Sequence, residues 1–306
     1  MTSSKPIDLV LVLDANYENY ASFLISQLVE YSLRQHADNF RFNLLTFDDF
    51  FPHKLLSESA QKSISVRVFQ NDYKVFNPSI QHSGHISKVA YLKLLIGEVL
   101  PRDVRRCIYL DVDILVNDQT PKIFNQECKL NSLIISNVEP GGSTHHPLFA
   151  AVPEMFSAGF MILNLELWRN LEFSKVCLDI LNEHGPLPWA DNDIIILAMN
   201  RIGLRCQPLD FALHFIPGKY GDSQLAGRNP VLVHFPGAGK PWNSPFGGKY
   251  ARTYRRRFRK YDPTFSITMQ AYQHYFFRRI RDYLYIIFMS FRKLKSIFGN
   301  FLAKQS

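Results

Sequence analysis

Two aspartates, Asp111 and Asp113, are separated by a single residue and follow the apolar run Cys107–Leu110. Side chains two residues apart on an extended chain share a face, so both carboxylates are expected to point the same way at the end of a strand. Paired carboxylate oxygens suit a hard divalent cation that also binds the phosphates of a substrate. The alternative is a solvated strand end. The buried strand before Asp111 favours the metal, because it fixes where the carboxylates lie.

A histidine much later in the chain also follows an apolar strand. His234 comes after Val-Leu-Val and precedes the loop 236–242, which contains Gly237 and Lys240. A glycine lets the backbone approach a ligand closely, and a lysine offers a compact positive charge to a phosphate. An imidazole added to two carboxylates shifts the metal preference from magnesium toward manganese. A purely structural histidine is the alternative at this point.

Three further groups have ambiguous patterns. Asp14 and Asn16 follow the first apolar strand, where a nucleotide base or ribose is often bound, although an ordinary polar turn would have the same composition. A second pair of carboxylates occurs in Asp191-Asn192-Asp193. The adjacent His145 and His146 are interpreted as loop surface, because neighbouring loop residues rarely converge on one ion.

The elements that must position these residues alternate between strands and helices over the first half of the chain. Such alternation predicts right-handed βαβ units and a mostly parallel sheet, in which ligands bind beyond the carboxyl ends of the strands. Asp14, Asp111 and His234 each lie at the carboxyl end of an apolar strand run. We expect strands at 7–13, 40–47, 64–69, 106–116, 133–138, 160–165 and 230–235, and helices after residue 20 and at 86–99, 173–184 and 193–201.

Length and composition limit the class of protein. The chain has 306 residues, of which 46% are hydrophobic and 20% charged, so a disordered or fibrous protein is excluded. The four cysteines are scattered and are expected to be free thiols in a reducing, cytoplasmic environment. The apolar run 7–13 is too short and polar for a signal peptide, and no apolar run reaches the length of a membrane-spanning helix.

The charge is concentrated at one end of the chain. Residues 251–306 contain thirteen Lys and Arg against two Asp, whereas residues 1–250 contain twenty-two basic and twenty-five acidic residues. We therefore expect a catalytic domain at 1–250 and a basic, aromatic and amphipathic helical tail at 251–306 that binds an anionic membrane surface. Nucleic-acid binding is the rival interpretation, and the apolar run 283–291 favours lipid over nucleic acid. A basic helix packed back on the body is the third alternative.

Taken together, the motifs resemble glycosyltransferase family 8, which includes bacterial lipopolysaccharide galactosyl- and glucosyltransferases. The resemblance covers about residues 7–243, and its closing motif His-x-x-Gly-x-x-Lys-Pro-Trp is the most specific part. The matching segments are Asp14-Ala-Asn16, His85-Ile-Ser87 with Tyr91, Tyr109-Leu-Asp111-Val-Asp113, Phe156-Ser-Ala-Gly159, Leu163-Asn-Leu-Glu-Leu-Trp168, Asp191-Asn-Asp193 and His234 to Trp242.

The resemblance implies an α/β fold of the GT-A type, with a Rossmann-like nucleotide-sugar-binding sheet. It also implies a retaining transfer of glucose or galactose from a UDP-sugar to a lipooligosaccharide, a lipopolysaccharide or another glycan acceptor. Together with the basic tail, this activity leads us to expect a peripheral protein on the cytosolic face of the inner membrane, which binds no nucleic acid.

The resemblance further implies a role for each matching residue. Asp111, Asp113 and His234 would ligate Mn²⁺, or Mg²⁺. Asp14 and Asn16 would meet the uracil and the ribose of the donor, and Gly237 and Lys240 its diphosphate. The remaining site residues implied are Lys93 and Val112 as further donor-binding positions, and Asp191 and Asn192 as catalytic residues at the donor sugar.

Three positions depart from the family pattern. Lys93 stands where the family commonly has Arg, Ser157 replaces an Asn, and Asn192 stands where lipopolysaccharide-type members have Gln. These departures keep open a nucleotide-sugar- or glycan-binding protein with little or no transferase activity. A nucleotidyltransferase is a further alternative, but it would need a Gly/Arg-rich phosphate loop near the N-terminus, which is absent from the sequence.

Overall fold

The computed structural model describes residues 6–35, 40–72, 76, 87–117, 123–124, 126–129, 131–141, 146–219, 225, 227–244, 248–268 and 276. The chain forms two compact units, Met1–Ala238 and Gly239–Ser306. Nearly all of the predicted site residues belong to the first unit.

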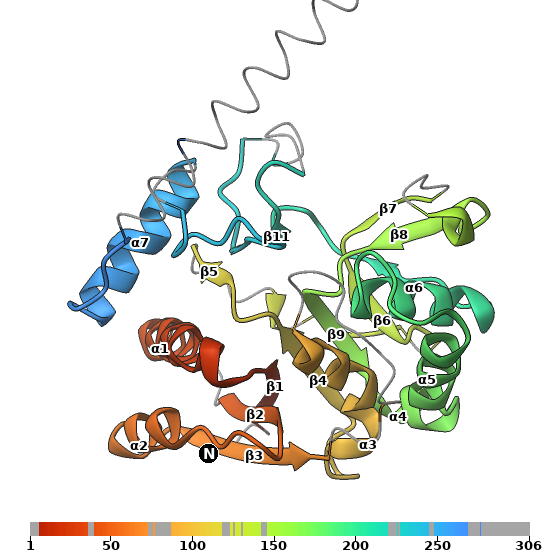
Figure 1. Cartoon of the computed structure of the whole chain (residues 1–306), viewed down its shortest axis with the longest axis horizontal. Helices are drawn as coiled ribbons and strands as arrows, with labels where there is room; N and C mark the ends of the chain where they lie inside the picture. The colour runs from red at the N-terminus through yellow and green to blue at the C-terminus, as the bar shows by residue number, and fades with distance from the viewer. Residues whose placement is uncertain are drawn as a thin grey trace, which may run out of the picture. The chain divides into compact units, whose positions relative to one another are not determined.

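A mostly parallel sheet organises the first unit (Figure 1). Among the described residues it has seven strands in the order β10-β6-β9-β4-β1-β2-β3, and only β9 runs antiparallel to its two neighbours. The predicted sheet is therefore confirmed. Its strands are β1 (Ile7–Val12), β2 (Phe40–Phe47), β3 (Ser65–Asn71), β4 (Arg106–Leu110), β6 (Ile134–Ser136), β9 (Phe160–Asn164) and β10 (Gln207–Pro208).

The central strand β1 is apolar on both faces because both faces are covered. Leu9 and Leu11 belong to one hydrophobic core and Val10 and Val12 to the other, so alternate side chains point to opposite sides of the sheet. The first core includes residues of α1 (Glu18–Gln35) and α2 (His53–Gln61). The second includes residues of η3 (Lys88–Leu95), α3 (Ile96–Val99), α4 (Leu165–Asn170), α5 (Phe173–His184) and α6 (Asp191–Arg201).

Two smaller sheets complete the first unit. β5 (Ile114–Val116), β12 (Leu232–His234) and β11 (His214–Phe215) form one, in which β12 is antiparallel to β5 and parallel to β11. β7 (Val138–Pro140) pairs with β8 (Glu154–Phe156) in the other. Two 3₁₀ turns are η1 (Ala15–Tyr17) and η5 (Pro147–Phe149).

The structure corrects three of the predicted elements. The strand expected at 106–116 is two strands, β4 and β5, which belong to different sheets and are separated by Asp111-Val-Asp113. The strand expected at 133–138 likewise divides at Asn137 into β6 and β7. The helix expected at 86–99 is mainly the 3₁₀ segment η3, with only its last turn α-helical. Apolar composition alone does not reveal where a buried strand leaves one sheet for another.

The second unit contains helix α7 (Lys249–Tyr261), which crosses the domain boundary expected at residue 250. Tyr254 and Phe258 are buried, and the Tyr254 ring lies 5.6 Å from that of Trp242. Arg255 Nη1 donates to the backbone oxygen of Ser244 at 2.8 Å. The start of the predicted tail is thus a packed helix, whereas the run 283–291 lies outside the described residues.

The basic residues of α7 are largely exposed. Its exposed positions are Lys249, Arg252, Arg256, Arg259 and Lys260. Within the described part of the chain, every helix is too short or too polar to cross a membrane.

Candidate active site

A break between two strands and one β-pairing create the centre of the site. Asp111 and Asp113 occupy the turn between β4 and β5, and the Asp111 amide donates to the Gly159 oxygen at 2.8 Å. β5 then pairs with β12 so that Ile114 lies opposite His234. The backbone amide of Phe235 donates to the backbone oxygen of Asp113 at 3.1 Å. This pairing places His234 beside carboxylates that are more than a hundred residues earlier in the sequence.

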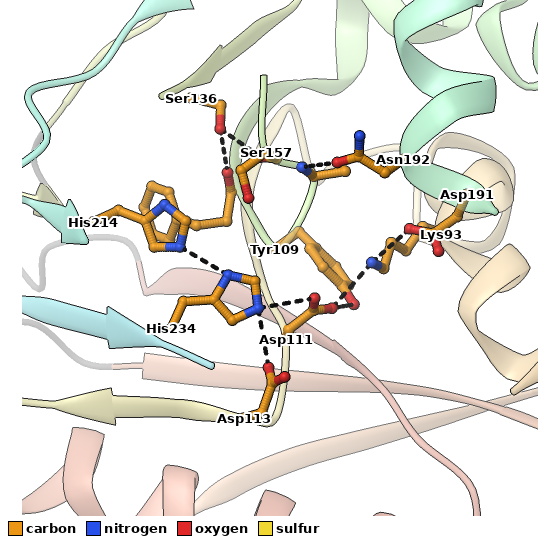
Figure 2. A network of polar contacts seen from close by, with 12 residues as sticks. Lys93, Tyr109, Asp111, Asp113, Ser136, Ser157, Asp191, Asn192, His214 and His234 are labelled. Carbon is orange, nitrogen blue, oxygen red and sulfur yellow. Dashed lines mark hydrogen bonds and ion pairs between the residues drawn. The ribbon is translucent and has the colours of Figure 1, made fainter. Parts of the chain in front are cut away.

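The two carboxylates and the imidazole converge (Figure 2). His234 Nε2 lies 3.4 Å from Asp111 Oδ2 and 3.2 Å from Asp113 Oδ1. One candidate ligand atom from each residue lies within 4.8 Å of the other two. Asp113 and His234 are buried, whereas the Asp111 side chain is 27% exposed and gives the cluster access to solvent.

This donor set fits a divalent metal ion. Within the described residues, the buried His234 Nε2 makes no hydrogen bond, although two carboxylate oxygens face it. Two carboxylate oxygens and one imidazole nitrogen are ligands that Mn²⁺ accepts readily, whereas Mg²⁺ prefers oxygen alone. The three residues predicted as metal ligands are therefore brought together.

Lys93 joins this cluster to a third carboxylate. Its Nζ lies 3.0 Å from Asp111 Oδ1 and 2.6 Å from Asp191 Oδ2, and it sits over the Tyr109 ring at 4.8 Å. The Tyr109 hydroxyl donates to the same Oδ1 of Asp111. One oxygen of Asp111 thus faces Lys93 and Tyr109, while the other faces His234 and is directed to the metal cluster.

Burial and charge compete in setting the ionisation of these groups. Burial acts to lower the pKa of Lys93, but the carboxylates of Asp111 and Asp191 outweigh it and raise that pKa. Burial acts to raise the pKa of Asp111, yet Lys93 and His234 hold it well below its usual range. For Asp191, burial prevails over Lys93 and raises the pKa. Lys93 is therefore charged and Asp111 ionised at neutral pH.

Asp191 and Asn192 begin helix α6, two residues earlier than the sequence predicts. Ala190 precedes them at φ 45°, a left-handed conformation unusual for alanine. Asn192 Oδ1 accepts a hydrogen bond from the Ala158 amide at 2.7 Å. The carbonyl end of the predicted catalytic Asn192 is thus engaged in holding the backbone at Ala158, and Asp191 is the residue that faces Lys93.

Gly159 is a site residue that sequence reasoning noted only as part of a motif. A Cβ at this position would lie 2.0 Å from His234 Cε1 and 2.8 Å from Asp111 Oδ2. The backbone here is held by Ser136, whose hydroxyl contacts the backbone oxygens of Ser157 at 2.6 Å and Phe160 at 2.8 Å. Only glycine leaves room for the imidazole at this distance.

Sequence reasoning also missed His214 and Asn137. His214 Nε2 lies 3.2 Å from His234 Nδ1, and the other ring nitrogen of His214 makes a short hydrogen bond with Asn137 Oδ1. Burial and the neighbouring His234 lower the pKa of His214, so its ring is neutral. No sequence motif identifies either residue, because His214 lies on the two-residue strand β11 and Asn137 between β6 and β7, far apart in the sequence.

For the other predicted donor-binding residues, the structure gives local contacts and conformations. Asp14 accepts from the Asn16 amide at 2.9 Å through one oxygen and from the Ser87 hydroxyl at 2.8 Å through the other. Val112 is buried in the core below the cluster. Gly237 adopts φ 74°, and Lys240 belongs to the second unit. His85 and His145 lie outside the described residues.

Comparisons with known proteins agree with this geometry. The sequence profile described as Glycosyl transferase family 8 matches residues 8–245. General stress protein A of Bacillus subtilis (strain 168) is 28% identical over 214 residues, which are 62% of this chain and 72% of the relative. Lipopolysaccharide 1,2-glucosyltransferase of Escherichia coli (strain K12) is 22% identical over 261 residues, or 79% and 75% of the two chains.

A solved structure shares the fold. The galactosyltransferase LgtC, crystallised with donor and acceptor sugar analogues, superposes with a TM-score of 0.62 at 19% identity. The match covers 82% of this chain and 95% of that one. The predicted GT-A type of fold is thereby confirmed.

Proposed function

Because the chain belongs to glycosyl transferase family 8 and is a glycosyltransferase, we propose that it transfers a hexose, glucose or galactose, from a UDP-sugar to a glycan acceptor with retention of configuration. The observation that carries this proposal is the convergence of Asp111, Asp113 and His234 beside the Lys93–Asp191 pair. A lone carboxylate pair would not distinguish a metal site from a solvated strand end.

In this proposal Asp111, Asp113 and His234 hold Mn²⁺, or Mg²⁺ in its place. The bound ion supplies positive charge that stabilises the departing diphosphate. Asp113 and His234 are fixed by burial, whereas the partly exposed Asp111 lies at the open side where a diphosphate would approach. The sequence resemblance adds Gly237 and Lys240 as proposed donor ligands, with Lys240 contributing charge to the diphosphate, whereas the buried side chain of Val112 is part of the core.

Asp191 and Lys93 act at the donor sugar. Asp191 is oriented by its 2.6 Å contact with Lys93, so that its carboxylate can accept a hydrogen bond from a sugar hydroxyl. Asn192 supports this arrangement through Ala158 and keeps its amide nitrogen for a polar contact. Asp14 and Asn16 bind the uracil and ribose, and the Ser87 hydroxyl fixes the Asp14 side chain.

The acceptor in this proposal is a lipooligosaccharide, a lipopolysaccharide or another lipid-linked glycan. Relatives named as lipopolysaccharide 1,2-glucosyltransferase and lipopolysaccharide 1,3-galactosyltransferase support that class. The exposed basic residues of α7 would suit an anionic membrane surface, and we propose that the enzyme is cytoplasmic and peripheral on the cytosolic face of the inner membrane.

A panel of UDP-sugars tests the proposal. We expect Mn²⁺-dependent hydrolysis or transfer with UDP-glucose or UDP-galactose, and no turnover after the ion is removed with a chelator. Binding of UDP that is strengthened by Mn²⁺ without turnover of any sugar would instead indicate a nucleotide-sugar-binding protein. That second function draws on the departures at Lys93, Ser157 and Asn192, and on the commitment of Asn192 Oδ1 to the Ala158 amide.

A further inference from the structure

A buried chain of polar groups begins at His234, and Figure 2 shows its next member, His214, on the side away from the two carboxylates. His234 Nδ1 meets His214 Nε2 at 3.2 Å, and His214 Nδ1 bonds to Asn137 Oδ1. His214 and Asn137 are fully buried, and His234 is 2% exposed. Buried polar groups of this kind are costly unless they are paired, so each of these two hydrogen bonds stabilises the arrangement.

Three different elements hold these residues. His214 is on β11, His234 is on β12, and Asn137 lies between β6 and β7. The parallel pairing of β11 with β12 brings the two imidazoles together. The rings stack at 5.2 Å between centroids with 28° between their planes, and His214 stacks on Phe160 at 5.4 Å.

The order of protons along this chain follows from Asn137. An amide oxygen only accepts, so His214 Nδ1 must carry the hydrogen. A neutral imidazole has one donor and one acceptor nitrogen, and His214 Nε2 is then the acceptor. It must receive a hydrogen from His234 Nδ1. In the neutral form of His234, which a metal ion requires, this leaves the lone pair on Nε2, the nitrogen that faces Asp111 and Asp113.

The opposite order has the opposite consequence. If the amide nitrogen of Asn137 faced His214, His214 Nε2 would donate to His234 Nδ1, and a neutral His234 would carry its hydrogen on Nε2. That hydrogen would point at the carboxylates and prevent Nε2 from ligating an ion. The direction of the hydrogen bonds from His234 through His214 to Asn137 therefore decides whether His234 Nε2 can bind an ion.

We propose that His214, held by Asn137, is a positioning residue that fixes the ring and the tautomer of His234 for binding of the divalent ion. The inference rests on the proposed function, since it assigns His214 to the same metal site. His214 itself touches neither donor nor acceptor in this account. Partners of this type orient imidazole ligands, and their loss typically weakens metal affinity roughly 10- to 100-fold.

Two substitutions separate the hydrogen bond from the ring contact. His214→Phe keeps an aromatic ring against His234 and Phe160 but has no acceptor. His214→Gln loses the ring but keeps a carbonyl that can accept from His234 and an amide that can donate to Asn137. If His214 only fills space, His214→Phe should retain the metal affinity of the parent better than His214→Gln. If His214 positions His234 through the hydrogen bond, His214→Gln should retain it better.

The experiment measures Mn²⁺ affinity of the full-length protein by electron paramagnetic resonance of free Mn²⁺, without donor, and checks each variant by thermal unfolding. We expect His214→Phe to bind roughly 10- to 100-fold more weakly, and His214→Gln to remain near the parent. A folded His214→Phe that binds Mn²⁺ as tightly as the parent would overturn the role of His214 but not the proposed function. A folded His214→Gln that binds Mn²⁺ as weakly as His214→Phe would do the same. A parent that binds neither Mn²⁺ nor Mg²⁺ would overturn the metal site and, with it, this role.

A second measurement needs no variant. Nitrogen-15 NMR of histidine-labelled parent protein reports which ring nitrogen of His214 carries the hydrogen. The expected result is a neutral ring protonated at Nδ1, with or without a bound ion. Protonation of His214 at Nε2 would reverse the direction of these hydrogen bonds. It would contradict the proposal even if His214→Phe does not fold.

Discussion

Lys93 is the cation that the carboxylates of Asp111 and Asp191 share. Its side chain is only 5% exposed and lies between the partly exposed Asp111 and the buried Asp191. An arginine at this position would reach two oxygens at once, whereas the single Nζ of Lys93 divides its contacts between two residues. Lysine thus supplies the same charge as arginine but shares it differently.

Removing this charge is expected to destabilise the fold. In Lys93→Met the buried Asp191 and the partly exposed Asp111 lose their common cation, and breaking the buried Lys93–Asp191 pair costs roughly 3–5 kcal/mol. Urea denaturation of the ion-free protein measures the loss. The matched variant Arg201→Met removes an exposed ion pair with Glu183 and should change the stability little. Equal stability of Lys93→Met and the parent would contradict this account of the pair.

Gly159 is expected to be intolerant of any side chain. The Cβ of Gly159→Ala would lie 2.0 Å from His234 Cε1, so the imidazole must move away from Asp111. We expect loss of measurable Mn²⁺ binding and of turnover, measured by calorimetry and by donor hydrolysis. Gly248→Ala is the control, because a Cβ there, its chain neighbours aside, meets no atom of the described residues within 4 Å. Normal Mn²⁺ affinity in Gly159→Ala would show that the ligand set is not the one described.

At the scale of elements, the link between β4 and β5 determines the site. β4 belongs to the large sheet and β5 to the small one, so Asp111 and Asp113 lie where the chain passes between sheets. The pairing of β5 with β12 then fixes His234 opposite Ile114. Short strands of three residues are sufficient for this task because their side chains are buried.

A second element contact stabilises the unit without entering the site. Arg169 at the end of α4 donates to the backbone oxygens of Gly97, Leu100 and Val104 at 2.7–2.9 Å. Arg169→Met should lower the free energy of unfolding by about 1.5–3 kcal/mol, the range for a hydrogen bond to a charged group. Mn²⁺ affinity should stay unchanged. The exposed Arg105→Met is the control, and a weaker metal affinity in Arg169→Met would show that this contact extends to the site.

Periodicity predicts the regular elements well and their ends less well. The bounds of β2 and α5 match the sequence prediction, because each has a clear apolar pattern and polar flanks. The break at Asp111-Val-Asp113 was not predictable from composition, since apolar residues stand on both sides and pairing partners are distant. Among the site residues, Asp111, Asp113 and His234 have recognisable motifs, whereas His214 and Asn137 depend on tertiary contacts that leave no local pattern.

At the scale of the whole molecule, the basic residues concentrate at the C-terminal end, and five of those in α7 are exposed while Tyr250, Tyr254 and Phe258 are buried. This pattern favours electrostatic attachment by the helix rather than insertion of its aromatic rings. Any apolar contribution from residues 283–291 would add to it.

Charge reversal tests that attachment. Arg252→Glu with Arg256→Glu should weaken binding to vesicles containing anionic lipid on the order of 30-fold or more, from about 1 kcal/mol per basic residue near the surface. Sedimentation with vesicles gives the affinity. Lys62→Glu with Lys175→Glu makes the same change of charge at exposed lysines of the first unit. An equal loss in both pairs would show that total charge matters and that α7 has no special role.

The central claim is that Asp111, Asp113 and His234 form one metal site that serves donor binding. Calorimetric titration of UDP with and without Mn²⁺, on the parent and on Asp113→Asn, tests it most directly. Asp210→Asn, which removes an exposed carboxylate paired with Arg228, is the matched control. We expect Mn²⁺ to strengthen UDP binding in the parent and in Asp210→Asn but not in Asp113→Asn, which should also lose turnover. Equal Mn²⁺-dependent binding and turnover in Asp113→Asn and the parent would contradict the claim.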